Sequence, residues 1–178
     1  MTKTDQLRAI LAEPGAEVMP GVFDAMSARL VERAGFRASF MSGFAVAAAR
    51  LAMPDTGLIS YTEMANQGQN MCDAVSMPII GDGDTGYGNA INTQRTVRLF
   101  EASGATAIQL EDQTFPKRCG HLKGKSLVPA GEMAGAGGHE PVGARGHLVS
   151  TERRRPDGDP VEQDLDADWR TVYMEASE

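Results

Sequence analysis

Short apolar runs alternate with longer amphipathic stretches along residues 1–110 of the chain. Each run ends in glycine or polar residues, and the stretch after it places apolar side chains three and four positions apart. The first pattern is typical of a buried strand, and the second of a helix with one face in a core. The patterns predict strands at 17–21, 38–41, 77–80 and 106–110, and helices at 4–11, 24–35, 44–51, 60–74 and 92–103. Successive strand–helix units predict a parallel sheet with right-handed crossovers.

Polar residues that can cap helix N-termini precede three of these helices. Asp24 precedes the second helix, Ser60 can form a capping box with Glu63 in the fourth, and Asn89 or Asn92 can cap the fifth. The apolar spacing also predicts the buried positions of these helices. They are Met26, Leu30, Val31 and Ala34 in the second helix, Met64, Met71 and Val75 in the fourth, and Val97 and Phe100 in the fifth.

The alternation stops at about residue 131, where the composition changes. A glycine-rich stretch is followed by a run of arginine, aspartate and proline, and no strand is expected there. Residues 164–176 can form one short helix, with Leu165, Trp169, Val172 and Tyr173 along one face. The chain is therefore predicted to divide into an ordered α/β part, residues 1–130, and a diverged, poorly ordered segment, residues 131–178.

The composition narrows the classes of function. The chain has 178 residues, a formal net charge of −7 and a pI near 5.0, which argues against nucleic acid or an anionic membrane as a partner. Its two cysteines cannot form a disulfide framework, and neither a secretory core nor a membrane-spanning run is evident. A cytoplasmic location is the expectation.

Carboxylates gather where the predicted strands end. Asp82 and Asp84 lie in a glycine-rich loop directly after the third strand, and Glu111 follows the fourth. Residues i and i+2 of an extended segment point the same way, so Asp82 and Asp84 can share one hard divalent cation such as Mg²⁺. Ser42 also follows a strand, and the carboxyl ends of parallel strands collect the reacting groups of such folds. The alternative is an ordinary surface turn, since Asp and Gly are good turn formers.

A cysteine surrounded by basic residues follows the fourth strand. Cys119 lies beside Lys117, Arg118 and His121, a setting that suits a thiol that transfers a proton or attacks an electrophile. A cysteine beside a solvated basic run is the alternative. Cys72, inside a helical pattern, is predicted to be a small buried apolar residue.

These motifs resemble the isocitrate lyase and phosphoenolpyruvate mutase superfamily over roughly residues 21–129. The likeness rests on Phe40-Met41-Ser42-Gly43, Pro54-Asp55, the loop from Asp82 to Gly88, Glu111-Asp112-Gln113 and Lys117-Arg118-Cys119-Gly120-His121. Because the other members usually lack the cysteine motif, the chain is most similar to the carbon–carbon lyases, such as 2-methylisocitrate lyase and 2,3-dimethylmalate lyase.

The resemblance implies a (β/α)8 barrel and a set of site residues. Asp82, Asp84 and Glu111 would bind Mg²⁺, with Mn²⁺ as a possible substitute. Cys119 and Asp55 would be catalytic, Cys119 as the proton donor. Substrate would be bound by Ser42, Gly43, Phe44, Gly120 and His121, and Gly120 would lie on a gating loop with Cys119.

The implied reaction is retro-aldol cleavage of a 2-hydroxy or substituted di- or tricarboxylate. Phosphonate or carboxyphosphonate mutase chemistry, oxaloacetate decarboxylation and an inactive pseudoenzyme are the alternatives. Because a full barrel needs about 250 residues, the sequence predicts an incomplete barrel of roughly four units, truncated or disrupted after about residue 130. Its uncovered edges favour a homo-oligomer or association with another half-barrel.

Overall fold

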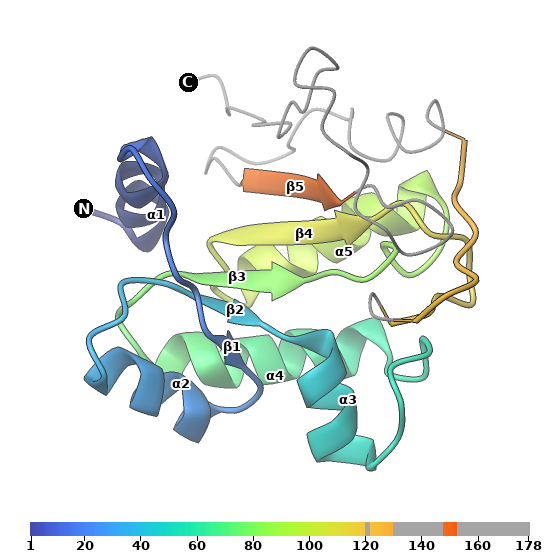
Figure 1. The fold of residues 1–178 in the computed structure, drawn as a ribbon, viewed down its shortest axis with the longest axis horizontal. Coiled ribbons are helices and arrows are strands. Elements are labelled where there is room, and N and C mark those ends of the chain that lie inside the picture. The colour runs from blue at the N-terminus through green and yellow to red at the C-terminus, as the bar shows by residue number, and fades with distance from the viewer. Residues whose placement is uncertain (120–121, 130–147, 153–178) are drawn as a thin grey trace.

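The computed structural model describes residues 1–119, 122–129 and 148–152, and Figure 1 shows their arrangement. Five parallel strands form one sheet in the order β1-β2-β3-β4-β5. The strands are β1 (Gly21–Val22), β2 (Ser39–Met41), β3 (Ile79–Asp82), β4 (Ala107–Glu111) and β5 (Leu148–Glu152). The helices are α1 (Lys3–Ala12), α2 (Ala25–Arg33), α3 (Gly43–Leu51), α4 (Tyr61–Ala74) and α5 (Ala90–Ala102).

The predicted α/β architecture and parallel sheet are confirmed, although the observed bounds of all four predicted strands differ from the expected ones. β1 and β3 each begin just after a proline, Pro20 and Pro78. The carbonyls of these prolines accept bonds from Phe40 N and Ser39 N, both at 3.1 Å. A proline nitrogen cannot donate a bond to a sheet. The backbone pairing of β1 and β3 therefore begins later than their apolar runs do. At its other end, β3 extends to include Asp82.

A fifth strand lies in the segment that was predicted to have none. β5 pairs with β4 over five residues, from Ala107↔Leu148 to Glu111↔Glu152. Its sequence has only two large apolar residues, Leu148 and Val149, too few for a periodic signal. Strand formation there follows from pairing with β4, a tertiary effect that local sequence does not record. The helix expected at 164–176 lies outside the described residues.

Capping side chains fix the starts of three helices as predicted. Asp24, Ser60 and Asn89 each form a capping box with the residue three positions on. Gly104, with φ of +89°, follows the end of α5. These bonds satisfy backbone N–H groups that a helix leaves open at its first turn.

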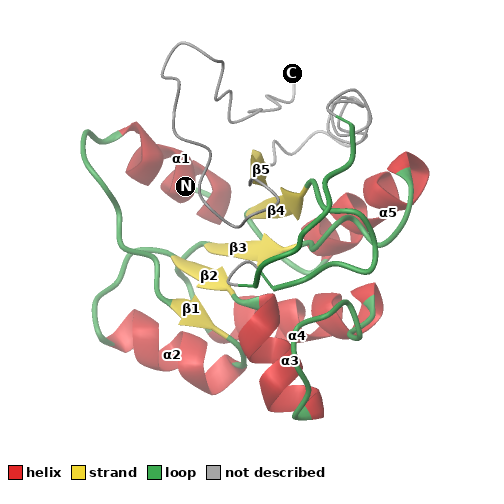
Figure 2. Cartoon of the chain, turned by 45° about the vertical axis from the view of Figure 1, so that its right-hand side comes forward, coloured by secondary structure: helices red, strands yellow, loops and turns green. Residues whose placement is uncertain are grey.

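Helices cover the outer face of the sheet, and α1 covers part of the opposite face (Figure 2). Phe100 of α5 and Met64 and Met71 of α4 pack with strand residues in the larger core. A smaller core joins Leu7 and Ile10 of α1 to Ala38, just before β2, and Ala107 at the start of β4. No described helix is both long and apolar enough to span a bilayer.

The predicted buried stripe of α2 is wrong. Met26 and Leu30 are 68% and 60% exposed, whereas Ala28 is fully buried and Val31 packs partly against the core. Because Ala28 is small, α2 can lie close to its neighbours. The larger Met26 and Leu30, on an adjacent face of the helix, then project outward. The apolar spacing identified an amphipathic helix but not which of two adjacent stripes makes the contact.

Gly81 in the middle of β3 allows α5 to lie against the sheet. A Cβ at Gly81 would be 2.5 Å from Cδ1 of Phe100, which is itself 1% exposed. We expect Gly81→Ala to lower the free energy of unfolding by about 1–3 kcal/mol, as overpacking of a core does. Chemical denaturation measures this free energy of unfolding. Gly21→Ala is the control, since a Cβ there meets only Ser42 Cβ at 3.6 Å, and equal losses in both variants would contradict the packing account.

Candidate active site

The inner face of the sheet presents carboxylates at the ends of β3 and β4. Ile79, Ile108 and Leu110 belong to the helix-side core. Because strand side chains alternate between faces, Asp82 and Glu111 project from the opposite, inner face. Both are the last residues of their strands. The predicted convergence of Asp82 and Glu111 at neighbouring strand ends is therefore observed.

Asp84 reaches the same place by a turn rather than by strand alternation. Its φ is +47°, so the chain is no longer extended when it reaches Asp84, and the expectation of an extended segment from Asp82 to Asp84 is wrong. Oδ1 of Asp82 accepts a hydrogen bond from Asp84 N at 3.0 Å. Glu111 N donates to the Asp84 carbonyl at 2.7 Å. Asx-type bonding of this kind stabilises a turn at the end of a strand.

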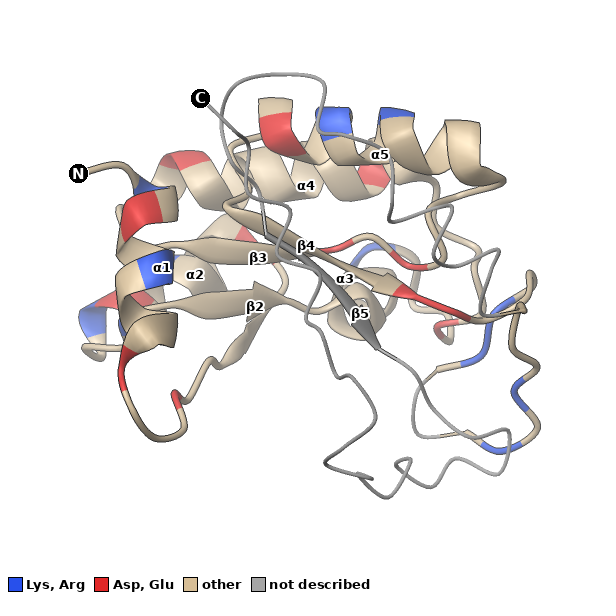
Figure 3. Ribbon diagram, turned by 90° about the horizontal axis from the view of Figure 1, so that it is seen from above, with Lys and Arg blue, Asp and Glu red and all other residues tan. Residues whose placement is uncertain are grey.

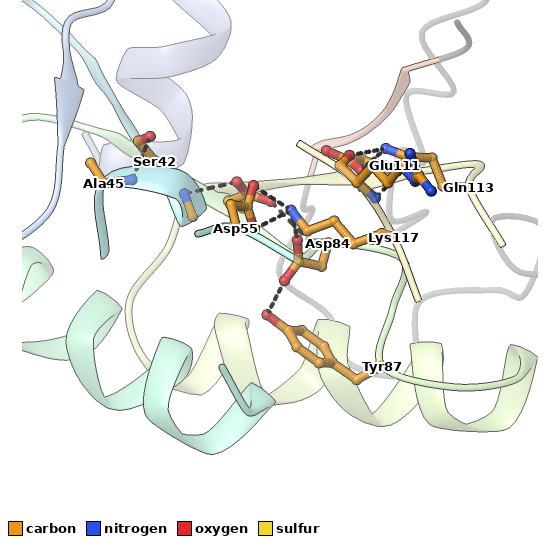
Figure 4. Close-up of polar contacts among 11 residues, drawn as sticks. Ser42, Ala45, Asp55, Asp84, Tyr87, Glu111, Gln113 and Lys117 are labelled. Atoms are coloured by element: carbon orange, nitrogen blue, oxygen red, sulfur yellow. Dashed lines mark hydrogen bonds and ion pairs between the residues drawn. The ribbon is translucent and has the colours of Figure 1, made fainter. Parts of the chain in front are cut away.

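A buried lysine ammonium lies between two of the carboxylates (Figure 4). Lys117 Nζ is 2.7 Å from Oδ1 and 2.7 Å from Oδ2 of Asp55. It also forms an ion pair with Oδ1 of Asp84. Lys117 is 3% exposed and Asp55 is 5% exposed, so the cluster is held away from water. Lys117 thus joins the segment between α3 and α4 and the loops after β3 and β4 through one charged group.

Ser42 and Gly43 join the start of α3 to Asp82. Gly43 N donates to Oδ2 of Asp82 at 2.8 Å, and Ser42 caps α3 by accepting from Ala45 N at 3.3 Å. A Cβ at Gly43 would lie 2.6 Å from that Asp82 oxygen, so only glycine permits the approach. Phe44 is 54% exposed. Substrate binding by these three residues stays a prediction.

Gln113 holds the loop that carries Cys119. Its Nε2 donates to Oε2 of Glu111 at 2.6 Å and to the Arg118 carbonyl at 2.9 Å, and its Oε1 accepts from Arg118 N. Cys119 follows and is half-buried, with its carbonyl bonded to Leu122 N at 2.8 Å. Figure 3 shows basic positions along this loop, near the acidic ends of β3 and β4. Gly120 and His121 lie outside the described residues.

Burial and mutual repulsion perturb the acidic groups. Burial, and then the charge of Asp84, raises the pKa of Asp82 to about 6, although Lys117 opposes the rise. Burial also raises the pKa of Asp84, and that of Glu111 to about 7. Burial disfavours a charged Lys117, but Asp84 and Glu111 outweigh it and raise the lysine's pKa. Perturbed groups that cluster in this way are typical of functional sites.

A pocket of about 460 Å³ opens beside Asp84 and Lys117. Its walls are largely apolar or aromatic, from Leu58, Ile59, Tyr61, Tyr87 and Phe115. A second hollow of about 270 Å³ shares Phe115 and reaches Glu111 and Gln113. Pockets of this size, apolar with a few convergent polar groups, suit small-molecule ligands.

The sequence patterns assigned no catalytic, substrate-binding or metal-ligating role to three residues of this site, Lys117, Gln113 and Tyr87. Lys117 was noted only as a neighbour of Cys119, Gln113 only as part of a motif, and Tyr87 only as part of the glycine-rich loop. The available signal for Lys117 was a basic residue in the loop after β4, opposite several strand-end carboxylates. Cys72 is buried and neither cysteine forms a disulfide, as expected.

The donor chemistry of the cluster fits a hard divalent cation. Its groups are carboxylate oxygens, and the buried Oδ1 of Asp84 already faces one cationic group, the Lys117 ammonium. Mg²⁺ takes such oxygens and needs only one or two protein carboxylates. In the described part of the chain, no three acidic, histidine or cysteine side chains are already grouped around one metal position. Asp82, Asp84 and Glu111 as a ligand set therefore stay a prediction.

Known proteins with related sequences include lyases and mutases. The chain is 43% identical to 2,3-dimethylmalate lyase of Eubacterium barkeri, over 76% of this chain and 47% of that protein. It is 48% identical to chloroplastic carboxyvinyl-carboxyphosphonate phosphorylmutase of Arabidopsis thaliana, over 70% of this chain and 37% of that protein. The chain thus spans less than half the length of each of these two relatives.

Solved structures show the same fold. A 2,3-dimethylmalate lyase described as a PEP mutase/isocitrate lyase superfamily member matches with a TM-score of 0.74 at 33% identity, covering 85% of this chain and 53% of that one. Phosphonopyruvate hydrolase in complex with oxalate and Mg²⁺ matches with the same score, identity and coverage. The family model for phosphoenolpyruvate phosphomutase matches residues 7–136. The chain therefore belongs to the phosphoenolpyruvate phosphomutase family of the PEP mutase/isocitrate lyase superfamily.

Proposed function

We propose that the chain carries the cation-binding site of a Mg²⁺-dependent carbon–carbon lyase. Its substrate would be a 2-hydroxy or substituted di- or tricarboxylate such as 2-methylisocitrate. The observation that carries the proposal is the buried cluster of Asp55, Lys117 and Asp84 beside Asp82. The phosphonopyruvate hydrolase structure with oxalate and Mg²⁺ supports the metal and the carboxylate ligand.

The chain's own groups suit the charge changes of retro-aldol cleavage. As the hydroxyl proton leaves to a base, the carbon–carbon bond breaks and its electrons delocalise into a carboxylate as an enediolate. The buried Lys117 ammonium supplies positive charge close to that site, in surroundings where charges act strongly. Bound Mg²⁺ would polarise the substrate oxygens and stabilise the developing negative charge. Cys119 would then protonate the enediolate carbon.

The pocket beside Asp84 and Lys117 supports a small carboxylate with an apolar part. Its charged lining residues are Asp84 and Lys117, and Leu58, Tyr61 and Phe115 supply apolar walls. A substituted hydroxy acid presents the same division between carboxylates and carbon skeleton. This match favours an organic acid over a highly charged polymer as the ligand.

Substrate conversion tests the proposed class of reaction. Purified protein with Mg²⁺ is incubated with 2-methylisocitrate, isocitrate, 2,3-dimethylmalate, oxaloacetate and phosphonopyruvate, and products are followed by NMR. We expect cleavage of at least one of the three hydroxy acids. Conversion of phosphonopyruvate or oxaloacetate alone would instead support the mutase or hydrolase chemistry found among relatives. No conversion of any acid would contradict the proposal.

Replacing Cys119 tests its role as proton donor. We expect Cys119→Ser to lower kcat for the cleaved acid by about 10²–10⁴-fold, the usual contribution of a positioned general acid. Mn²⁺ affinity should be unchanged, because the thiol is not a proposed ligand. Cys72→Ala is the control, since Cys72 is a buried side chain of α4. Full activity of Cys119→Ser would remove the cysteine from the mechanism.

A further inference from the structure

Tyr87 occupies a backbone conformation that side chains usually avoid. Its φ is +60°, between Gly86 at +83° and Gly88 at +146°. The turn is fastened to α5, because Thr96 Oγ1 donates to the Gly86 carbonyl at 3.0 Å. A bulky residue with positive φ is an outlier that persists only where the surroundings hold it. The conformation returns the Tyr87 side chain toward Asp84, as Figure 4 shows.

The Tyr87 ring is held on two sides. It packs against the helix-side core, and its centroid lies 6.2 Å from that of Tyr61 at an interplanar angle of 52°. The Arg95 guanidinium covers the Tyr61 ring at 5.3 Å from its centroid. Tilted aromatic pairs and cations over rings are favourable arrangements. The phenol oxygen therefore has a fixed position relative to the loop after β3.

The two carboxylate oxygens of Asp84 have different partners. Oδ2 accepts a hydrogen bond from the Tyr87 hydroxyl at 3.0 Å. Oδ1 forms an ion pair with the Lys117 ammonium. The phenol hydroxyl is the donor of that bond. One oxygen is thus held by a neutral group, and the other is directed at a cation.

We propose that Tyr87 is a positioning residue that makes Asp84 a one-oxygen ligand, holding Oδ2 so that Oδ1 alone faces a divalent cation. This inference rests on the cation site of the proposed function. Outer groups that hydrogen-bond to a ligating carboxylate fix its orientation, and their loss typically weakens metal affinity 10–100-fold. A tyrosine serving only as core filling would keep its role without the hydroxyl, because phenylalanine fills the same space.

Mn²⁺ binding to Tyr87→Phe tests the proposal without relying on turnover. Free Mn²⁺ is titrated by its EPR signal against wild type, Tyr87→Phe and Tyr61→Phe. We expect the Mn²⁺ dissociation constant of Tyr87→Phe to rise by about 10–100-fold. Tyr61→Phe, which removes the other phenol of the same pocket wall, should match wild type. Equal affinities for Tyr87→Phe and wild type would overturn the inference.

A second readout examines the metal-free protein. With aspartate labelled at ¹³Cγ, the Asp84 signal is assigned by its absence in Asp84→Asn. We expect this signal to shift in Tyr87→Phe and to stay in place in Tyr61→Phe. An unmoved signal in Tyr87→Phe would show that the hydroxyl does not hold the carboxylate, and would overturn the inference.

The outcomes separate this inference from the proposed function. Wild-type protein that binds no Mn²⁺ overturns both. Wild-type protein that binds Mn²⁺ and loses affinity in Tyr87→Phe, yet cleaves no acid, supports Tyr87 and overturns the lyase. Where cleavage is seen, raising Mg²⁺ should restore the kcat of Tyr87→Phe toward wild type, because the hydroxyl acts through the cation site. A deficit that no Mg²⁺ concentration restores would overturn the positioning role.

Discussion

Lys117→Met should lower the free energy of unfolding by about 3–5 kcal/mol at neutral pH, the usual cost of removing one partner of a buried ion pair. The lysine is the shared partner of Asp55 and Asp84, and all three side chains are buried. Without it, two carboxylates remain in a space with little access to water. Urea denaturation of metal-free protein measures the change.

A divalent cation should offset part of this loss. Mg²⁺ can neutralise the same carboxylates, so we expect it to stabilise Lys117→Met more than it stabilises wild type. Lys123→Met is the control because Lys123 is an exposed lysine of the same loop, and a surface change of this kind is usually small. An unfolding free energy of Lys117→Met equal to that of Lys123→Met would show that the buried ion pairs contribute nothing.

Asp82→Asn should lower kcat/KM by about 10³-fold, or ~4 kcal/mol, because it removes a proposed cation ligand while keeping the side-chain shape. Its effect on stability should be small, within about 1 kcal/mol. Burial and Asp84 raise the pKa of Asp82 to about 6. A carboxyl with a raised pKa contributes most stability below its unfolded pKa and loses that contribution as pH rises through about 6. At pH 7 the charged group is therefore not a source of stability.

The control for Asp82→Asn is Asp73→Asn, at an exposed aspartate of α4. It makes the same chemical change at an exposed position of a helix. We expect Asp73→Asn to keep both kcat/KM and unfolding free energy. Comparable activity in the two variants would exclude Asp82 from the site, whereas a large loss of stability in Asp82→Asn alone would assign it a structural role.

Local signals in the sequence predicted much of the fold. Capping residues such as Ser60 and Asn89 and the apolar runs before Asp82 and Glu111 act over a few residues, so the sequence records them directly. The placement of Asp82 and Glu111 at strand ends followed from this. The family motifs added Asp55, which lies against Lys117 in the structure.

Features that depend on distant partners were not predictable in the same way. Lys117 and Asp55 are 62 positions apart, and nothing near either residue indicates the other. β5 depends on pairing with β4, and Asp84 adopts a positive φ that its neighbours in sequence allow but do not require. In each case tertiary contacts choose among conformations that local sequence leaves open.

Anomalous scattering from a crystal soaked in Mn²⁺ tests the central claim most directly, because it locates the cation without assuming a substrate. The account predicts a peak beside the carboxylates of Asp82 and Asp84, with the Lys117 ammonium moved away from Oδ1 of Asp84. A fully soaked crystal with no peak at these strand ends, or with Mn²⁺ bound only elsewhere, would contradict the proposed cation site.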